Sequence, residues 1–307
     1  MLKNYINQLL SNFRNKKNWD RPEKNMVAIA TYSNEFTTNI GDAIQENAIF
    51  DAIKIVLPDL EIVKIPRDRW SSSKFRGLNV MQGWFGKKSA IPKRQKLWLG
   101  THFAGKLHEH IKKHPPGGDF GARDEATRAI VSGAYLSRCY TLTLPRRKSA
   151  PESGRVFLTQ IPYEWEKFIP VELLKDCVRI THHYEGPDMS AAARELIARY
   201  RDEARLVITC KVHCAAPCTA LGIPVVAISE GSEGANRMNF LDGIIKIYSE
   251  QDLRDREIDW NPMVPDIEEL KVLMLKNLQM SIQAAQGISV DCQELENTRL
   301  KIGTFSN

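Results

Sequence analysis

Residues 206–228 read LVITCKVHCAAPCTALGIPVVAI, and this stretch decides the fold class. The apolar run at 206–209 predicts a buried strand, a helical stretch ends at 221–222, and a second apolar run at 223–228 predicts the next strand. A strand, a helix and a strand in this order form a β-α-β unit, whose two strands are parallel. The stretch therefore predicts an α/β fold.

The same alternation continues along the rest of the chain. Residues 26–32 (MVAIATY) predict a buried strand, and Asp42 then precedes an amphipathic run with Gln45 in capping-box register, which predicts a helix capped by Asp42. Further strands are predicted at 60–65, 78–81, 97–100, 156–161 and 178–181, and further helices at 125–132, 190–203 and 266–285. The two series predict two Rossmann-like domains in tandem, with parallel sheets that face a cleft.

The chain length supports this division. A chain of 307 residues is longer than a single core usually supports, so two domains are expected. Residues 145–154 (PRRKSAPESG) combine Pro, Gly, Ser and charge without periodicity, which is typical of a linker. We predict an N-terminal domain at 1–147, a C-terminal domain at 154–287 and a loosely packed tail at 288–307.

Charge is distributed unevenly between the two halves. Residues 1–150 carry 26 Lys and Arg against 13 Asp and Glu, a net charge of +13, whereas residues 151–307 carry 17 against 24, a net charge of −7. The basic half favours an anionic partner, such as a phosphorylated small molecule or a membrane surface. Residues 1–17 predict a short basic amphipathic helix, which either packs on the domain or lies on an anionic membrane.

Several classes of protein are excluded. No apolar run approaches the roughly 18 to 20 residues that span a bilayer, and no signal peptide begins the chain, so a cytoplasmic protein is expected. Neither a dinucleotide-binding nor a P-loop glycine motif follows a strand, and basic residues are not interleaved with aromatic ones, so no cofactor and no nucleic acid are expected. The thiols Cys210, Cys214 and Cys218 recur on one helix face, which predicts packing rather than a metal site.

Candidate site residues follow the predicted strands. In open parallel sheets, ligands bind beyond the carboxyl ends of the strands, beside helix N-termini that favour anions. Lys211 and His213 follow one strand, the segment 39–42 (NIGD) follows another, and Arg123 and His102 stand in comparable places. These residue types suit anion binding with proton transfer, although a solvated lysine, an ordinary helix-start histidine and a capping aspartate account for them equally well.

Five blocks, in order, resemble those of the polysaccharide pyruvyl transferase family. The family's fold resembles that of two-domain GT-B glycosyltransferases, and its members transfer the enolpyruvyl group of phosphoenolpyruvate to a sugar and close it into a ketal. The blocks are NIGD at 39–42, QGWF at 82–85, GARDEAT at 121–127 followed by CYTLTL at 139–144, LVITCKVHCAAPCTALGIPVV at 206–226, and NRMNFLD at 236–242.

The resemblance implies roles for ten residues. It implies catalytic roles for His213, Asp42 and His102, phosphoenolpyruvate binding by Arg123, Lys211 and Arg237, and acceptor binding by Asn39, Gly41, Gln82 and Trp84. The chain departs from the family at two positions, since Lys211 stands in place of an arginine and Gln82 in place of an asparagine. A lysine lacks the planar, two-pronged grip of a guanidinium, so the departure at 211 bears on how the donor is bound.

The chemistry of such a transfer needs both an acid and a base. We hypothesise that His213 protonates C3 of the donor or assists phosphate departure, and that Asp42 or His102 removes the proton of the acceptor hydroxyl. The implied acceptor is a glycan or a lipid-linked saccharide at the inner face of the membrane. Two alternatives stay open, a nucleotide-sugar glycosyltransferase on the same architecture and a binding protein that has lost catalysis.

Overall fold

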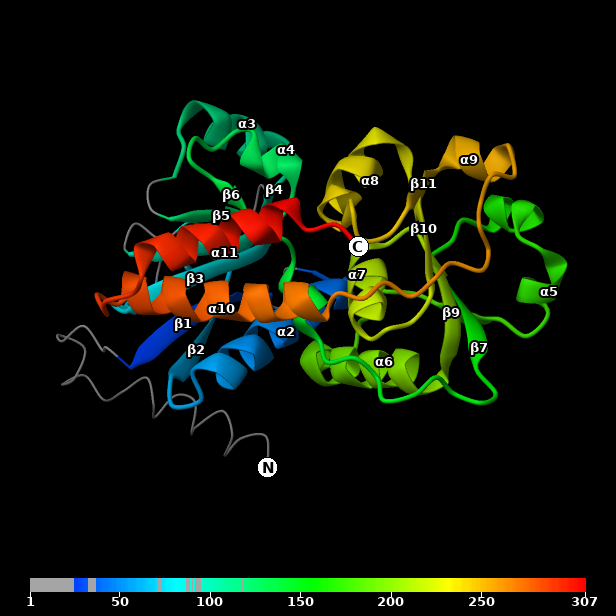
Figure 1. The fold of residues 1–307 in the computed structure, drawn as a ribbon, viewed down its shortest axis with the longest axis horizontal. Coiled ribbons are helices and arrows are strands. Elements are labelled where there is room, and N and C mark those ends of the chain that lie inside the picture. The colour runs from blue at the N-terminus through cyan, green and yellow to red at the C-terminus, as the bar shows by residue number, and fades with distance from the viewer. Residues whose placement is uncertain are drawn as a thin grey trace.

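The computed structural model describes residues 25–32, 37–70, 73–86, 89, 91, 95–116 and 119–307, without the side chains of residues 232 and 233. Within these residues the chain forms two parallel β-sheets side by side, which we call the first and second lobes (Figure 1). The α/β fold with two parallel sheets is therefore confirmed. The helix predicted at 1–17 lies outside the described residues.

The first lobe is built on a six-stranded sheet in the order β2-β1-β3-β4-β5-β6, and every neighbouring pair is parallel. Its central strands are buried almost throughout, because helices cover both faces of a parallel sheet. The strands are β1 (Met26–Thr31), β2 (Glu61–Pro66), β3 (Leu78–Phe85), β4 (Lys96–Phe103), β5 (Phe120–Ala122) and β6 (Tyr135–Leu136).

The second lobe has a five-stranded parallel sheet in the order β11-β10-β9-β7-β8. Residues 206–228 lie in β9, α7 (Val212–Ala220) and β10, and β9 and β10 are parallel neighbours, so the predicted β-α-β unit is confirmed. Pro217 lies inside α7. The strands are β7 (Arg155–Thr159), β8 (Val178–Ile180), β9 (Ala204–Thr209), β10 (Val225–Ser229) and β11 (Ile247–Ser249).

One hydrophobic core runs through both lobes. It joins side chains of the first sheet, such as Ile29 and Leu99, to side chains of α7 and the second sheet, such as Ala215 and Val207. The helix α2 (Ile40–Val56) of the first lobe packs on α6 (Met189–Glu203) of the second, and Arg194 makes a two-pronged ion pair with Asp51 between them. The lobes therefore meet along a packed interface.

The end of the chain returns to the first lobe. The helices α10 (Glu268–Ala285) and α11 (Cys292–Thr304) pack on each other and against the first sheet, as Figure 1 shows in orange and red. Leu295, Thr298 and Ile302 of α11 are buried. The expectation of a loosely packed tail is therefore wrong, because α11 carries an apolar stripe that this surface covers.

Two predicted helix starts also differ from the structure. Asn39, not Asp42, caps α2, since the Asn39 side chain accepts a hydrogen bond from the Gly41 amide at 3.1 Å. Asp42 lies in the first turn of the helix and does not have the capping role predicted for it. The helix predicted at 266–285 begins at Glu268, after Ile267.

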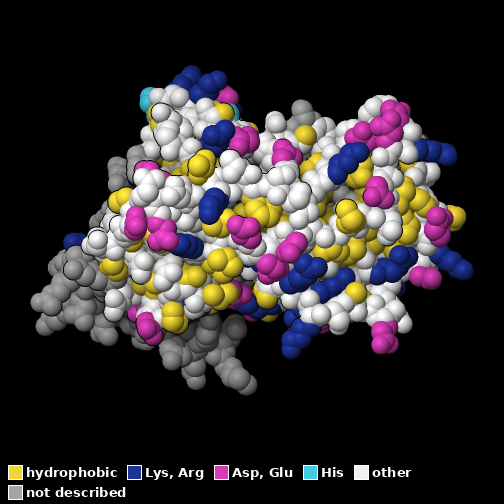
Figure 2. Space-filling view, in the orientation of Figure 1, with side chains coloured by type: hydrophobic (Ala, Val, Ile, Leu, Met, Phe, Trp, Pro, Cys, Tyr) yellow, Lys and Arg dark blue, Asp and Glu magenta, His cyan; other side chains and the backbone are white. Residues whose placement is uncertain are grey.

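The remaining elements are short. They are α3 (Gly105–Lys113), α4 (Glu125–Arg128), α5 (Val171–Leu174), α8 (Gly231–Met238) and α9 (Glu250–Arg254), with 3₁₀ turns η2 (Tyr140–Thr143), η3 (Tyr163–Phe168) and η4 (Asn239–Leu241). Lys, Arg and His side chains gather over α3 at one corner of the first lobe (Figure 2). No helix in the described part of the chain is long and apolar enough to cross a membrane.

Candidate functional site

A pocket of about 380 Å³ lies where the two lobes meet. It opens at the carboxyl ends of β7, β9 and β10 and at the N-terminus of α2, which is where parallel sheets bind their ligands. Four of the ten predicted site residues line it, namely Asn39, Lys211, His213 and Arg237; Thr38, His182 and Glu230 are among the others.

Backbone pairing between the lobes borders the pocket. Asn39 and His183 form an isolated antiparallel bridge, in which the Ile40 amide donates to the His182 carbonyl and the Tyr184 amide donates to the Thr38 carbonyl, both at 2.8 Å. This pairing fixes the start of α2 against the second lobe. Backbone hydrogen bonds therefore fix the position of one lobe against the other at the pocket.

His213 lines the pocket from the first turn of α7. It is buried, and its Nε2 has no hydrogen-bond partner among the described residues. Gly41 makes room for its ring, because a Cβ added there would lie 2.4 Å from His213 Nδ1. Burial, followed by the positive charges of Arg123 and Arg237, lowers the pKa of His213 well below its ordinary value. The imidazole is therefore neutral at pH 7 in the absence of an anion.

Arg123 is fully buried in the first lobe, next to this pocket but not among its lining residues. Its Nε donates to Asp124 Oδ2 at 3.3 Å, whereas Nη1 and Nη2 have no hydrogen-bond partner in the described part of the chain. After burial, Arg123 is the strongest influence on the pKa of His213. A buried guanidinium with two bare nitrogens is costly and fits an anion in a two-pronged contact.

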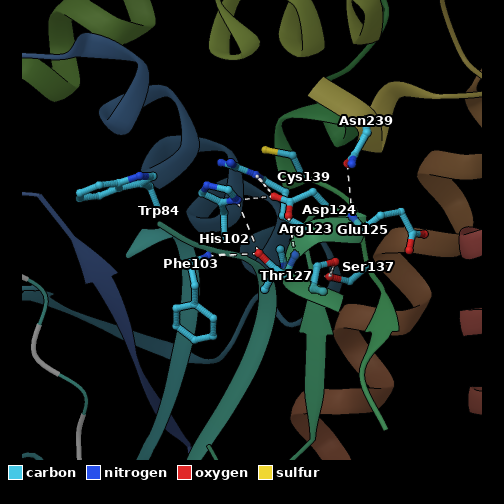
Figure 3. Close-up of polar contacts among 12 residues, drawn as sticks. Trp84, His102, Phe103, Arg123, Asp124, Glu125, Thr127, Ser137, Cys139 and Asn239 are labelled. Atoms are coloured by element: carbon cyan, nitrogen blue, oxygen red, sulfur yellow. Dashed lines mark hydrogen bonds and ion pairs between the residues drawn. The ribbon is translucent and has the colours of Figure 1, made fainter. Parts of the chain in front are cut away.

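His102 and Asp124 form a short, buried pair. His102 Nδ1 lies 2.6 Å from Asp124 Oδ2, and Figure 3 shows this carboxylate connected to both His102 and Arg123. Burial and the charge of Arg123 lower the pKa of His102, although Asp124 acts against them. Burial alone would raise the pKa of Asp124, but the hydrogen bond with His102 and the nearby positive charges keep it below its ordinary value. Asp124 is therefore ionised.

Asp42 is a second buried carboxyl group beside the pocket. Burial raises its pKa to about 6, although a hydrogen bond from the Thr37 hydroxyl at 2.8 Å and the charges of nearby arginines act against the rise. A carboxylate with a pKa near the ambient pH is suited to accept a proton during a reaction. Asp42 does not cap α2, and a catalytic role for it stays a prediction.

Lys211 and Arg237 supply positive charge to the pocket from the second lobe. Lys211 precedes α7, and its Nζ lies 3.3 Å from Glu230 Oε2, with both side chains partly exposed. Arg237 lies on α8, the helix that follows β10, and lines the pocket. An ion pair this exposed contributes little to stability, so the lysine is available to an incoming anion.

Gln82 and Trp84 do not line the pocket. Gln82 is buried in β3 and donates from Nε2 to the Ala30 carbonyl at 3.0 Å. Their backbone carbonyls accept hydrogen bonds from the buried guanidinium of Arg67, which also lies 4.0 Å from the Tyr32 ring centroid. In the absence of a ligand these groups serve the fold, and acceptor binding by Gln82 and Trp84 stays a prediction.

Two features of this site have little signal in the sequence. Asp124 caps α4 by accepting a hydrogen bond from the Thr127 amide at 3.0 Å, an ordinary local role, yet it also holds His102 and Arg123. His182, which comes shortly after β8, lines the pocket. Among the described residues, no cluster of His, Cys, Asp or Glu could hold a metal ion.

Comparisons with known proteins find distant structural likenesses. A scan against protein-family models matches none of them, and a search of curated proteins finds no match. A functionally uncharacterised protein from Klebsiella pneumoniae is similar at a TM-score of 0.43 and 11% identity over 78% of this chain and 93% of that one. The wall teichoic acid polymerase TagF gives 0.41 and 11% over 98% and 94%, and the glycotransferase of kitacinnamycin gives 0.33 and 9% over 91% and 98%. At such low similarity, a likeness does not identify a reaction.

Proposed function

We propose that the protein is a group transferase of glycan biosynthesis, whose phosphorylated donor binds between the two lobes. The observation that carries the proposal is the pair of bare nitrogens on the buried Arg123, whose charge acts on His213, a pocket residue with a bare Nε2. Two buried guanidinium donors without hydrogen-bond partners are costly in the free protein, even though Nε of Arg123 pairs with Asp124. An anionic ligand at this place removes that cost.

The donor that fits best is phosphoenolpyruvate, as the resemblance to pyruvyl transferases implies. It is small and carries a phosphate and a carboxylate, which matches a pocket of about 380 Å³, near the lower end for ligand sites. Lys211, Arg237 and Arg123 supply three cations from three separate segments, namely the start of α7, α8 and the turn between β5 and α4. One anionic group would engage Arg123, and the other would lie between Lys211 and Arg237.

The buried groups then have opposite tasks. Burial and, after it, nearby positive charges keep His213 neutral. A doubly negative donor offsets these charges, so the pKa of His213 rises and the imidazolium can give its proton to C3 of the donor or to the departing phosphate. Asp42 or His102 takes the proton from the acceptor hydroxyl as its oxygen bonds to C2. General acid and base catalysis of this kind contributes about 10²- to 10⁴-fold.

Calorimetric titration with phosphoenolpyruvate tests this proposal. The parent protein should bind the compound, and Arg123→Gln should weaken binding by about 100-fold or more, because two charge-assisted hydrogen bonds are lost. Arg128→Gln is the matched control, since Arg128 lies on the neighbouring α4, where its half-exposed side chain pairs with Glu125. Equal binding by the parent and Arg123→Gln, or no binding by the parent, would contradict the proposal.

A nucleotide-activated sugar is the second candidate donor, and Glu230 favours it. This carboxylate follows β10 at the pocket and repels anions, whereas acidic side chains after a strand bind ribose hydroxyls in nucleotide sites. Glycosyl transfer is also the activity in the names of two of the solved structures, at a similarity too low to add weight. Incubation with a glycan acceptor separates the candidates, since one releases phosphate and the other a nucleotide.

A further inference from the structure

Asp124 joins two groups of the site through a single oxygen atom. Its Oδ2 lies 2.6 Å from His102 Nδ1 and 3.3 Å from Arg123 Nε, and the side chains of all three residues are buried. Its other oxygen, Oδ1, accepts a hydrogen bond from the Thr127 amide at the start of α4. Both carboxylate oxygens are therefore occupied, and the side chain cannot turn toward a ligand.

We propose that Asp124 is a positioning residue that couples the anion grip of Arg123 to proton transfer at His102. The inference rests on the proposed function for the identity of the anion, but the coupling itself is a property of these three side chains. The sequence resemblance assigns no role to Asp124.

The first half of the coupling is geometric. An ionised carboxylate accepts hydrogen bonds only, so Nδ1 of His102 carries the proton in the pair. The opposite ring nitrogen, Nε2, is then the one that can accept a proton, as in other histidines oriented by a carboxylate. Asp124 thereby fixes both the tautomer and the ring orientation of His102.

The second half is electrostatic. The charged groups that act on His102 are Asp124 and Arg123 after β5 and Arg237 on α8, with His213 of α7 nearby. In the free protein burial and the two arginines oppose protonation of the ring, and Asp124 favours it. An anion on the bare nitrogens of Arg123 offsets that opposition, so His102 becomes a stronger base when the donor is bound. A hydroxyl proton can then pass to Nε2 while the hydroxyl oxygen forms its new bond.

Histidine NMR on the full chain tests the coupling without any substrate. Asp124→Asn keeps a side-chain oxygen that can cap α4, so the variant should fold. We expect its His102 signal, assigned by its loss in His102→Gln, to show mixed ring tautomers and a lower pKa than in the parent. Arg123→Gln should raise the pKa of His102, because it removes the charge that an anion would offset. Asp242→Asn, at an aspartate beside the buried Arg138, is the charge-matched control and should leave the His102 signal unchanged.

Two results would overturn the inference. One is an unchanged His102 tautomer and pKa in Asp124→Asn, which would leave Asp124 as a helix cap only. The other is an unchanged pKa of His102 in Arg123→Gln, which would mean that the grip and the base act independently. Addition of phosphoenolpyruvate to the parent is a separate arm. If the compound fails to bind while both variants behave as expected, the proposed donor is wrong and the coupling stands.

Discussion

Two buried arginines of the first lobe, Arg138 and Arg123, have opposite surroundings. Arg138 donates from all three of its nitrogens to backbone carbonyls of Phe240, Asp242, Ile302 and Phe305. Arg123 is equally buried, yet two of its three nitrogens have no partner among the described residues. A buried cation with every donor used holds the fold together, whereas one with bare donors lowers stability until an anion arrives. Burial alone therefore does not tell a structural arginine from a binding one.

The largest expected effect lies on the structural side of this comparison. Arg138→Met leaves four backbone carbonyls, two of them in buried hydrogen bonds, without this donor and releases the chain end from the first lobe, so the free energy of unfolding should fall by about 4 kcal/mol. Urea denaturation followed by circular dichroism measures the change. A loss below about 1 kcal/mol would mean that these hydrogen bonds contribute little, and the contrast with Arg123 would disappear.

Asp42 tests whether a buried acidic group near the pocket also lowers the stability of the free protein. Its pKa of about 6 in the folded protein, against 3.8 ordinarily, means that the folded state binds the proton more tightly and loses stability as the pH rises from 4 to 6. Asp42→Asn removes this cost, so it should raise the free energy of unfolding by about 3 kcal/mol at pH 8 and leave it unchanged at pH 3. Unfolding curves at both pH values measure this, and an equal effect at both would show that titration of Asp42 is not the cause.

Substitution of Gly41, beside His213 of the pocket, and of Gly303, in α11, tests how tightly each place is packed. A methyl group at Gly41 would collide with the ring of His213, so Gly41→Ala should lower the free energy of unfolding by about 2 kcal/mol and alter the His213 NMR signal. Gly303, in α11, is the control, because a Cβ there meets only Leu136 at 3.8 Å. Gly303→Ala should be stabilising by about 0.5 to 1 kcal/mol through helix propensity. The same sign for both substitutions would contradict the close approach at His213.

The smallest effect on stability is expected at Arg123 itself. Arg123→Met removes a buried charge whose terminal nitrogens have no partner, while Asp124 keeps His102 and the Thr127 amide, so the free energy of unfolding should change by less than about 1 kcal/mol or rise. Thermal denaturation next to Arg138→Met gives a direct contrast. A loss as large as that of Arg138→Met would show that Arg123 is structural.

The sequence predicted the sheets because buried parallel strands are short apolar runs between turn residues, as at 206–228. It could not predict that α10 and α11 return to the first lobe, because an amphipathic stripe does not say which surface will cover it. The start of α2 was misassigned because Asn39 and Asp42 are both good caps, and the strand-like pairing of Asn39 with His183 from the second lobe favours the first.

The site was predicted in part for a similar reason. Lys211, His213 and Arg237 reach one pocket because strand ends gather at one edge of a parallel sheet, a regularity that local sequence reveals. The link from Asp124 to His102 joins residues 22 positions apart, and the same aspartate is fully explained locally as a cap. Whether a buried arginine is partnered depends on carbonyls from distant segments, as at Arg138, so sequence alone could not separate it from Arg123.

We propose that Arg123 is held ready for an anion, and a crystal structure of the protein with phosphoenolpyruvate is the decisive experiment. We predict an anionic group of the donor within hydrogen-bond distance of both Nη1 and Nη2 of Arg123, with His213 beside it. Donor bound only against Lys211 and Arg237, with the terminal nitrogens of Arg123 still bare, would contradict the account.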